Sequence, residues 1–140
     1  MDTFDQNRAS AYLRVALDAA RKAADISRNY YAGNFTVMTK EDRTPVTQAD
    51  VECEHAIREV ILSKFPDHGF YGEESGTARK DADYLWLVDP IDGTKSFVGG
   101  YGMWSTQIAL MYRGELVLGV SCAPAAGEMA WATRGGGAFL

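Results

Sequence analysis

The hydrophobic pattern of the first half of the chain predicts two helices. From residue 5 to residue 31, apolar residues recur at steps of three and four, which places one set on a single helical face: Leu13, Ala16, Leu17, Ala20, Ala23 and Ala24. Gly33 is the expected end of this helix, because glycine tolerates the left-handed conformation common there. A second helix is expected to begin at Thr47, with Thr47 as N-cap and Asp50 as its capping-box partner. Its apolar face would contain Cys53, Ala56, Ile57, Val60 and Ile61, and Pro66 follows its end.

The rest of the pattern predicts strands separated by turns. Apolar and β-branched runs indicate strands at 35–40, 68–75, 84–88, 105–112, 115–121 and 129–133, with another beginning at 138. Arg113-Gly114 separates two of these runs by the two residues that a tight hairpin turn needs. The stretch 84–88 is apolar throughout, which suits a strand buried on both faces, whereas the polar stretch 76–83 is expected to be a surface loop. No repeat or linker interrupts the pattern, so we expect one domain.

Composition narrows the class of protein. The 140 residues suffice for one domain with a core, and their net charge of -5 leaves no basic stripe, so we expect no nucleic-acid partner. Cys53 and Cys122 are too few for a disulfide framework or a zinc site, and both are expected to be small apolar residues. No apolar run approaches membrane-spanning length, and the first residues do not resemble a signal peptide. These observations favour a cytoplasmic protein with no membrane partner.

The stretch 84–97 carries the clearest indication of chemistry. Asp89 and Asp92 follow the apolar run, and Gly93-Thr94 then opens a short helix. Carboxylates at the end of a buried strand offer the oxygen ligands that Mg²⁺ prefers, and free backbone N–H groups at a helix start receive an anion. Glu73 also follows a strand-like run. The pattern therefore indicates a metal-dependent phosphatase site.

Each of these acids also has a simpler explanation. Asp89 and Asp92 suit a turn followed by a helix cap, and Asp50 suits its capping box. Glu73 and Glu74 are neighbours on a predicted strand, so only one of them is expected to face a given site. The position of both acidic groups after strand-like segments favours a site, because open α/β sheets bind ligands at such ends.

Four segments carry a resemblance to a known family. They are Thr44-Pro45-Val46-Thr47-Gln48-Ala49-Asp50, Gly72-Glu73-Glu74-Ser75, Trp86-Leu87-Val88-Asp89-Pro90-Ile91-Asp92-Gly93-Thr94 and Gly135-Gly136-Gly137-Ala138-Phe139. In this order they closely resemble the inositol monophosphatase family of Mg²⁺-dependent phosphomonoesterases. The resemblance implies an α+β fold, a layered α-β-α-β-α sandwich of the inositol monophosphatase/fructose-1,6-bisphosphatase type. Residues 1–140 would be the N-terminal portion of a single phosphatase domain, because a later Trp-Asp motif that supplies another metal ligand has no counterpart here.

The resemblance also implies a role for each acid. Two or three Mg²⁺ ions would be held by Glu73, Asp89, Asp92 and the backbone carbonyl of Ile91, with Asp89 bridging two of them. Glu73 would also help to activate the attacking water, and Asp50 would support that water from outside the metal ligands. No covalent phosphoenzyme would form.

For the substrate, the resemblance implies a small phosphorylated molecule. Its phosphate would lie beside Asp92 and the backbone N–H groups of Gly93 and Thr94, the Thr94 hydroxyl also orienting the water, and Lys40 is a further candidate near the metals. Lys95-Ser96-Phe97 is more similar to the histidinol-phosphate phosphatases of the family than to its inositol monophosphatases. Histidinol phosphate is therefore the expected substrate, with inositol 1-phosphate or another sugar or nucleotide phosphate as alternatives. A homodimer is expected by analogy.

Two other classes of function stay open. Phosphatases of the haloacid dehalogenase type attack with an aspartate in an Asp-x-Asp-x-Thr motif, but Asp89 and Asp92 are three residues apart. A non-catalytic fragment or metal-binding module is the other alternative. A triad of nucleophile, base and acid is not indicated, because His55 and His68 both have contexts typical of surface or packing residues.

Overall fold

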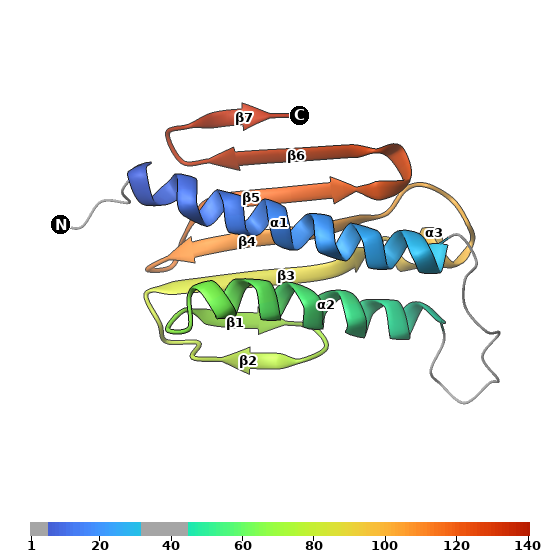
Figure 1. Cartoon of the computed structure of the whole chain (residues 1–140), viewed down its shortest axis with the longest axis horizontal. Helices are drawn as coiled ribbons and strands as arrows, with labels where there is room; N and C mark the ends of the chain where they lie inside the picture. The colour runs from blue at the N-terminus through green and yellow to red at the C-terminus, as the bar shows by residue number, and fades with distance from the viewer. Residues whose placement is uncertain (1–5, 32–44) are drawn as a thin grey trace.

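Two long helices lie side by side on one face of a seven-stranded sheet in the computed structural model of this chain (Figure 1). The structure describes residues 6–31 and 45–140. Helix α1 spans Gln6–Tyr31, α2 spans Pro45–Lys64, and the short α3, Thr94–Val98, lies at one end of the sheet. The strands are β1 Gly69–Gly72, β2 Gly76–Ala78, β3 Tyr84–Asp92, β4 Ser105–Tyr112, β5 Glu115–Ala123, β6 Glu128–Thr133 and β7 Gly137–Phe139. A 3₁₀ turn, η1 Pro124–Ala126, joins β5 to β6.

The order of the strands across the sheet is β2-β1-β3-β4-β5-β6-β7. Strands β1 and β3 run parallel, and every other described pair is antiparallel. The parallel pair matters for the site, because the carboxyl ends of two parallel strands lie at the same end of a sheet.

Helix α1 packs on the sheet through small residues. Its fully or almost fully buried positions include Ala16, Ala19, Ala20, Ala23 and Ala24, and the core that they join includes Ile57, Trp86, Ile108 and Leu110. Alanine lets the helix backbone approach its neighbours closely. The predicted helical face is confirmed with a small rotation, since Leu13 and Leu17 pack at its margin and are only partly buried. Cys53 and Cys122 are buried free cysteines, as predicted.

The opposite face of the sheet is not covered by a helix in the described part of the chain. Along β3, Trp86 and Val88 are buried under the helices, whereas Leu85 and Leu87 are only partly buried. The prediction that this strand is buried on both faces is therefore wrong for the described residues, because α1 and α2 lie on the same side. Across the open face Leu87 is followed by small residues of neighbouring strands, Ala109 and then Gly119.

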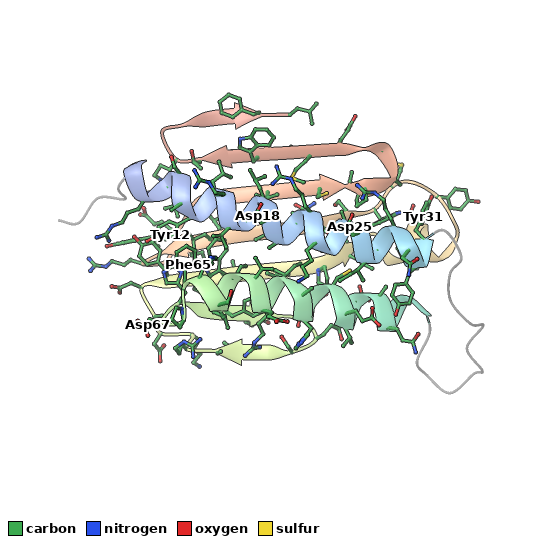
Figure 2. The ribbon with its side chains drawn as sticks, viewed as in Figure 1. Tyr12, Asp18, Asp25, Tyr31, Phe65 and Asp67 are labelled. Atoms are coloured by element: carbon green, nitrogen blue, oxygen red, sulfur yellow. The ribbon has the colours of Figure 1, made fainter. Side chains whose placement is uncertain are left out.

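An aromatic cluster joins the start of α1 to the end of α2, where Figure 2 shows Tyr12 beside Phe65. The imidazole of His68 stacks between Phe65 and Tyr84, with ring centroids 4.7 and 4.8 Å away. The indole Nε1 of Trp86 donates a hydrogen bond of 3.0 Å to Nδ1 of His68. Burial lowers the pKa of His68 to about 4, with nearby Asp67 acting weakly in the opposite direction. His68 is thus a packing residue, as predicted.

Two tight turns follow from their sequence. Arg113 and Gly114 have φ angles of 48° and 84°, the left-handed pair that a two-residue hairpin turn requires, and they join β4 to β5 as predicted. The 135–137 glycine run likewise turns the chain between β6 and β7. The predicted strands at 105–112, 115–121 and 129–133 are therefore confirmed within a residue or two, and the strand expected to begin at 138 begins at Gly137.

Other boundaries differ from the prediction. Helix α2 begins at Pro45, so Thr47 lies inside the helix and cannot be its N-cap; proline is well suited to the first helical position because it has no N–H to leave unpaired. Strand β1 ends at Gly72, and Glu73 and Glu74 lie in the turn that leads to β2. The expected loop 76–83 therefore contains a short strand. The predicted strand 35–40 and Gly33 lie outside the described residues.

Candidate active site

The carboxyl ends of β1 and β3 bring Glu73 next to Asp89. Gly72 pairs with Val88 in the parallel register, so the residues that follow them, Glu73 and Asp89, lie at the same level of the sheet. Both line a groove of about 620 Å³ on the open face. Two residues that the sequence assigned to one site are therefore neighbours in space.

A β-bulge lies between the two aspartates of β3. The strand pairs with β4 through Asp89 and again at Asp92, with a register shift between them. Pro90 lies in this bulge, where the pairing with β4 is interrupted, so its missing N–H costs no inter-strand hydrogen bond. Its carbonyl oxygen accepts a hydrogen bond of 2.8 Å from the hydroxyl of buried Thr106. Bulges change the direction in which side chains point. Here Asp89 is partly buried and Asp92 is exposed.

The surroundings of Asp89 are unfavourable to a lone negative charge. Burial raises its pKa, the negative charges of Glu73 and Asp92 raise it further, and the backbone N–H of Ile91 acts in the opposite direction. Its Oδ1 atom is buried and has no hydrogen-bond partner among the described residues. A buried oxygen without a partner is costly unless something else satisfies it, and a hard divalent cation takes such oxygens as ligands.

Asp50, in the first turns of α2, faces the same group of acids. Burial raises its pKa to about 7, and the charges that add to this effect are those of Glu74, Asp89, Glu73 and Glu54, in that order. All four are carboxylates. The acids of α2, of the 73–75 turn and of β3 therefore form one region of negative charge, which fits a cation and repels a free anion.

Gly93 connects β3 to α3 by a conformation that other residues rarely adopt. Its φ is 100°, and a Cβ atom there would lie 2.6 Å from the carbonyl oxygen of Met103. Helix α3 begins at the next residue, Thr94. Behind it, Ile91, Phe97 and Trp104 pack in a small core of their own. This packing fixes the start of α3 close to Asp92.

Sequence reasoning missed Glu54, which is fully buried on α2. Its carboxylate accepts hydrogen bonds from the backbone N–H groups of Glu74 and Ser75, in the turn that carries Glu73. Helical spacing held a signal, because Glu54 follows Asp50 by one turn and lies between the buried Cys53 and Ile57. An acid at an apolar position of a helix is a candidate for a structural or catalytic role.

The expected metal ligands do not form a preformed metal-binding site in the described residues. In the described ranges, 6–31 and 45–140, no group of three or more His, Cys, Asp or Glu side chains is arranged to hold a metal ion. The negative charges of Glu73 and Asp92 both raise the pKa of Asp89, but Asp92 is not among the residues that line the groove. Lys40 lies outside the described residues, and of Thr94 only the backbone is described.

Comparison with known proteins identifies the family. Residues 9–140 match the inositol monophosphatase family. A histidinol-phosphatase of Chlorobaculum parvum is 43% identical over 134 residues, covering 91% of this chain and 50% of the relative. An inositol-1-monophosphatase of Rhizobium meliloti is 39% identical over 134 residues, with coverage of 94% and 50%.

The fold comparison agrees with the sequence comparison. An inositol monophosphatase structure from Zymomonas mobilis has a TM-score of 0.82 and 34% identity, covering 97% of this chain and 51% of that one. The chain thus spans about half the length of the curated relatives it matches, and the expected α+β fold of inositol monophosphatases is confirmed over this half. No described helix is long and apolar enough to cross a membrane. From the match over residues 9–140 and this shared fold, the chain belongs to the inositol monophosphatase family.

Proposed function

We propose that this chain forms the N-terminal portion of a Mg²⁺-dependent phosphomonoesterase, in which water attacks a small phosphomonoester directly. The observation that carries the proposal is the carboxylate of Asp89. One of its oxygens is buried without a partner among the described residues, and the charges of Glu73 and Asp92 act on it. Relatives named as histidinol-phosphatases and inositol monophosphatases support the same reaction class.

The metal would be held by Glu73, Asp89, Asp92 and the backbone carbonyl of Ile91, as the family resemblance implies. When bound, Mg²⁺ would supply the positive charge that activates water near neutral pH and stabilises the charge of the transferring phosphoryl group. Glu73 would help to orient the attacking water and to take its proton. Asp50 would support the attacking water from outside the metal ligands, as the family resemblance implies.

The phosphate would lie where β3 passes into α3. The left-handed Gly93 and the first residue of α3, Thr94, would present backbone N–H groups to its oxygens, beside Asp92. Lys40 stays a candidate for the metal region. The alcohol that departs from the phosphate would then lie over the groove that Glu73 and Asp89 line.

We favour histidinol phosphate as the substrate. The segment Lys95-Ser96-Phe97 resembles that branch of the family, and histidinol-phosphatases of three organisms are 39% to 43% identical to this chain. Inositol 1-phosphate is the second candidate, since inositol-1-monophosphatases are 38% and 39% identical. The small difference in identity makes the substrate a question for direct assay.

The test is phosphate release by the full-length protein from histidinol phosphate and from inositol 1-phosphate, with and without Mg²⁺. Asp89→Asn should abolish Mg²⁺-dependent release, whereas Asp18→Asn should not, because Asp18 lies exposed on α1 (Figure 2) and pairs with Arg21. If neither substrate released phosphate in a Mg²⁺-dependent manner, the proposal would be contradicted. Cation binding without hydrolysis would instead favour a non-catalytic module, and a trapped phosphoaspartate at Asp89 would favour an aspartyl nucleophile.

A further inference from the structure

Glu54 is a fully buried acid to which the reaction proposed above gives no role. It projects from the third turn of α2 toward the turn between β1 and β2. A carboxylate removed from water is costly unless it is well hydrogen-bonded. The hydrogen bonds that Glu54 makes therefore indicate what it does.

Within the described part of the chain, the hydrogen bonds of the Glu54 carboxylate all go to one short segment. The backbone N–H of Glu74 lies 3.0 Å from each of its two carboxylate oxygens, and the N–H of Ser75 donates to Oε2. Hydrogen bonds to a carboxylate are stronger than those between neutral groups. Two successive peptide groups after Glu73 are thus held by a single side chain.

The backbone before Glu73 is shaped around the same carboxylate. A Cβ atom at the buried Gly72 would lie 2.4 Å from Cδ of Glu54 and 2.6 Å from each of its oxygens. Only glycine lets the chain pass this close. Glu73 therefore stands between one residue that touches the Glu54 carboxylate and another that donates to it.

Arg58, one turn further along α2, holds the same turn by a second contact. Its guanidinium donates to the hydroxyl of Ser75 at 3.0 Å and to the carbonyl oxygen of Ser75 at 3.4 Å. Helix α2 thereby fixes both the N–H and the carbonyl of Ser75. This support is important because β2 is a three-residue strand at the edge of the sheet, which can contribute little rigidity of its own.

We propose that Glu54 is a positioning residue for Glu73: by fixing the 73–75 turn to helix α2, it sets where the Glu73 carboxylate meets the divalent cation beside Asp89. The inference rests on the proposed function, in which Glu73 is a metal ligand. Groups that hold metal ligands in place affect metal affinity by about 10- to 100-fold. Glu54 acts through the backbone of the turn and does not itself contact the metal.

Mn²⁺ titration followed by the electron paramagnetic resonance of the free ion tests this role without relying on turnover. Glu54→Gln keeps the size of the side chain but replaces one acceptor oxygen by an amide that cannot accept an N–H. We expect it to weaken Mn²⁺ binding by about 10-fold or more. The control is Ile57→Val, which removes one buried methyl group from the same helix and leaves the turn untouched, and it should bind Mn²⁺ like the wild type.

A double-mutant cycle separates positioning from general destabilisation. Glu73→Gln alone should weaken Mn²⁺ binding, and Glu54→Gln on that background should add little, because the ligand that it positions is already lost. Equal weakening by Glu54→Gln and Ile57→Val, or full additivity with Glu73→Gln, would overturn the inference. Wild-type binding by Glu54→Gln, together with weak binding by Glu73→Gln, would overturn this inference alone. Absence of Mn²⁺ binding by the wild type would overturn the proposed function and this inference with it.

Hydrogen exchange of the unmutated protein provides a measurement that does not depend on a variant folding. The amides of Glu74 and Ser75 lie in an exposed turn, yet they should exchange slowly because they donate to a buried carboxylate. The amide of Gly114, in the exposed turn between β4 and β5, is the comparison. Exchange of Glu74 and Ser75 as fast as that of Gly114 would overturn the inference.

Discussion

Acidification should destabilise this protein through His68, a residue remote from the candidate site. His68 accepts a hydrogen bond at Nδ1 from the Trp86 indole, so that nitrogen is unprotonated in the folded state. Protonation would remove this acceptor and place a positive charge on a ring packed between Phe65 and Tyr84. Burial accordingly lowers the pKa of His68 from 6.5 to about 4. Because the folded pKa is the lower one, the stability that this group contributes is present above pH 6.5 and is lost as the pH falls toward 4.

The magnitude follows from the two pKa values. The full shift corresponds to about 3 kcal/mol, and at pH 5 about 2 kcal/mol of it would be lost, because most unfolded chains and few folded ones then carry the proton. Partial exposure of His68 reduces the expected loss at pH 5 to about 1–2 kcal/mol.

Urea unfolding of the wild type and of His68→Phe, followed by tryptophan fluorescence at pH 7.5 and pH 5, isolates the loss of stability that is due to protonation of His68. Phenylalanine keeps the ring stack and does not titrate, so the wild type should lose about 1–2 kcal/mol more than the variant between the two pH values. His55→Phe is the control: its side chain is 78% exposed, and the variant should follow the wild type. An equal loss by the wild type and His68→Phe would refute the reasoning.

Three further predictions concern the end of β3 and a hairpin. Without divalent cations, Asp89→Asn should raise the thermal unfolding temperature at pH 8, because it removes a negative charge that burial and the neighbouring carboxylates disfavour. Mg²⁺ should then stabilise the variant less than it stabilises the wild type, and an equal response to Mg²⁺ would contradict this prediction. Gly93→Ala should cost about 2 kcal/mol or more in urea unfolding, since it combines a φ of 100° with a Cβ 2.6 Å from the carbonyl oxygen of Met103. Gly114→Ala should cost only about 1 kcal/mol by the same measurement, because its φ is also positive but no atom lies within 4 Å; a cost equal to that of Gly93→Ala would show that the close contact has no effect.

Local signals predicted much of the fold. Arg113-Gly114 identified a hairpin because few residue pairs adopt two successive left-handed conformations at low cost. The spacing of alanines identified the buried side of α1, since a helical period is a property of the sequence itself. The predicted start of α2 was wrong by two residues, because both Thr47, with its capping pattern, and Pro45 are typical of a helix start, and the sequence alone does not choose between them.

Features that depend on distant segments were harder to predict. β2 has only three residues, one of them Gly76, and it is a strand only because β1 pairs with it. The one-sided burial of β3 depends on where both helices pack, which an apolar run does not specify. Glu54 was overlooked because an acid within a helix is usually solvated, and its partners Glu74 and Ser75 lie 20 and 21 residues away.

The open face of the sheet affects how this chain will behave at the bench. Side chains such as Leu87 and Trp131 line a groove there with small neighbours, and Phe139 on the last strand is 54% exposed. Contiguous apolar surface of this kind adsorbs to hydrophobic resins, binds fluorescent dyes such as anilinonaphthalene sulfonate, and promotes aggregation as the protein is concentrated. We therefore expect the fluorescence of such a dye to increase when the folded chain is added. We also expect light scattering to increase more than in proportion to protein concentration, as the chain aggregates.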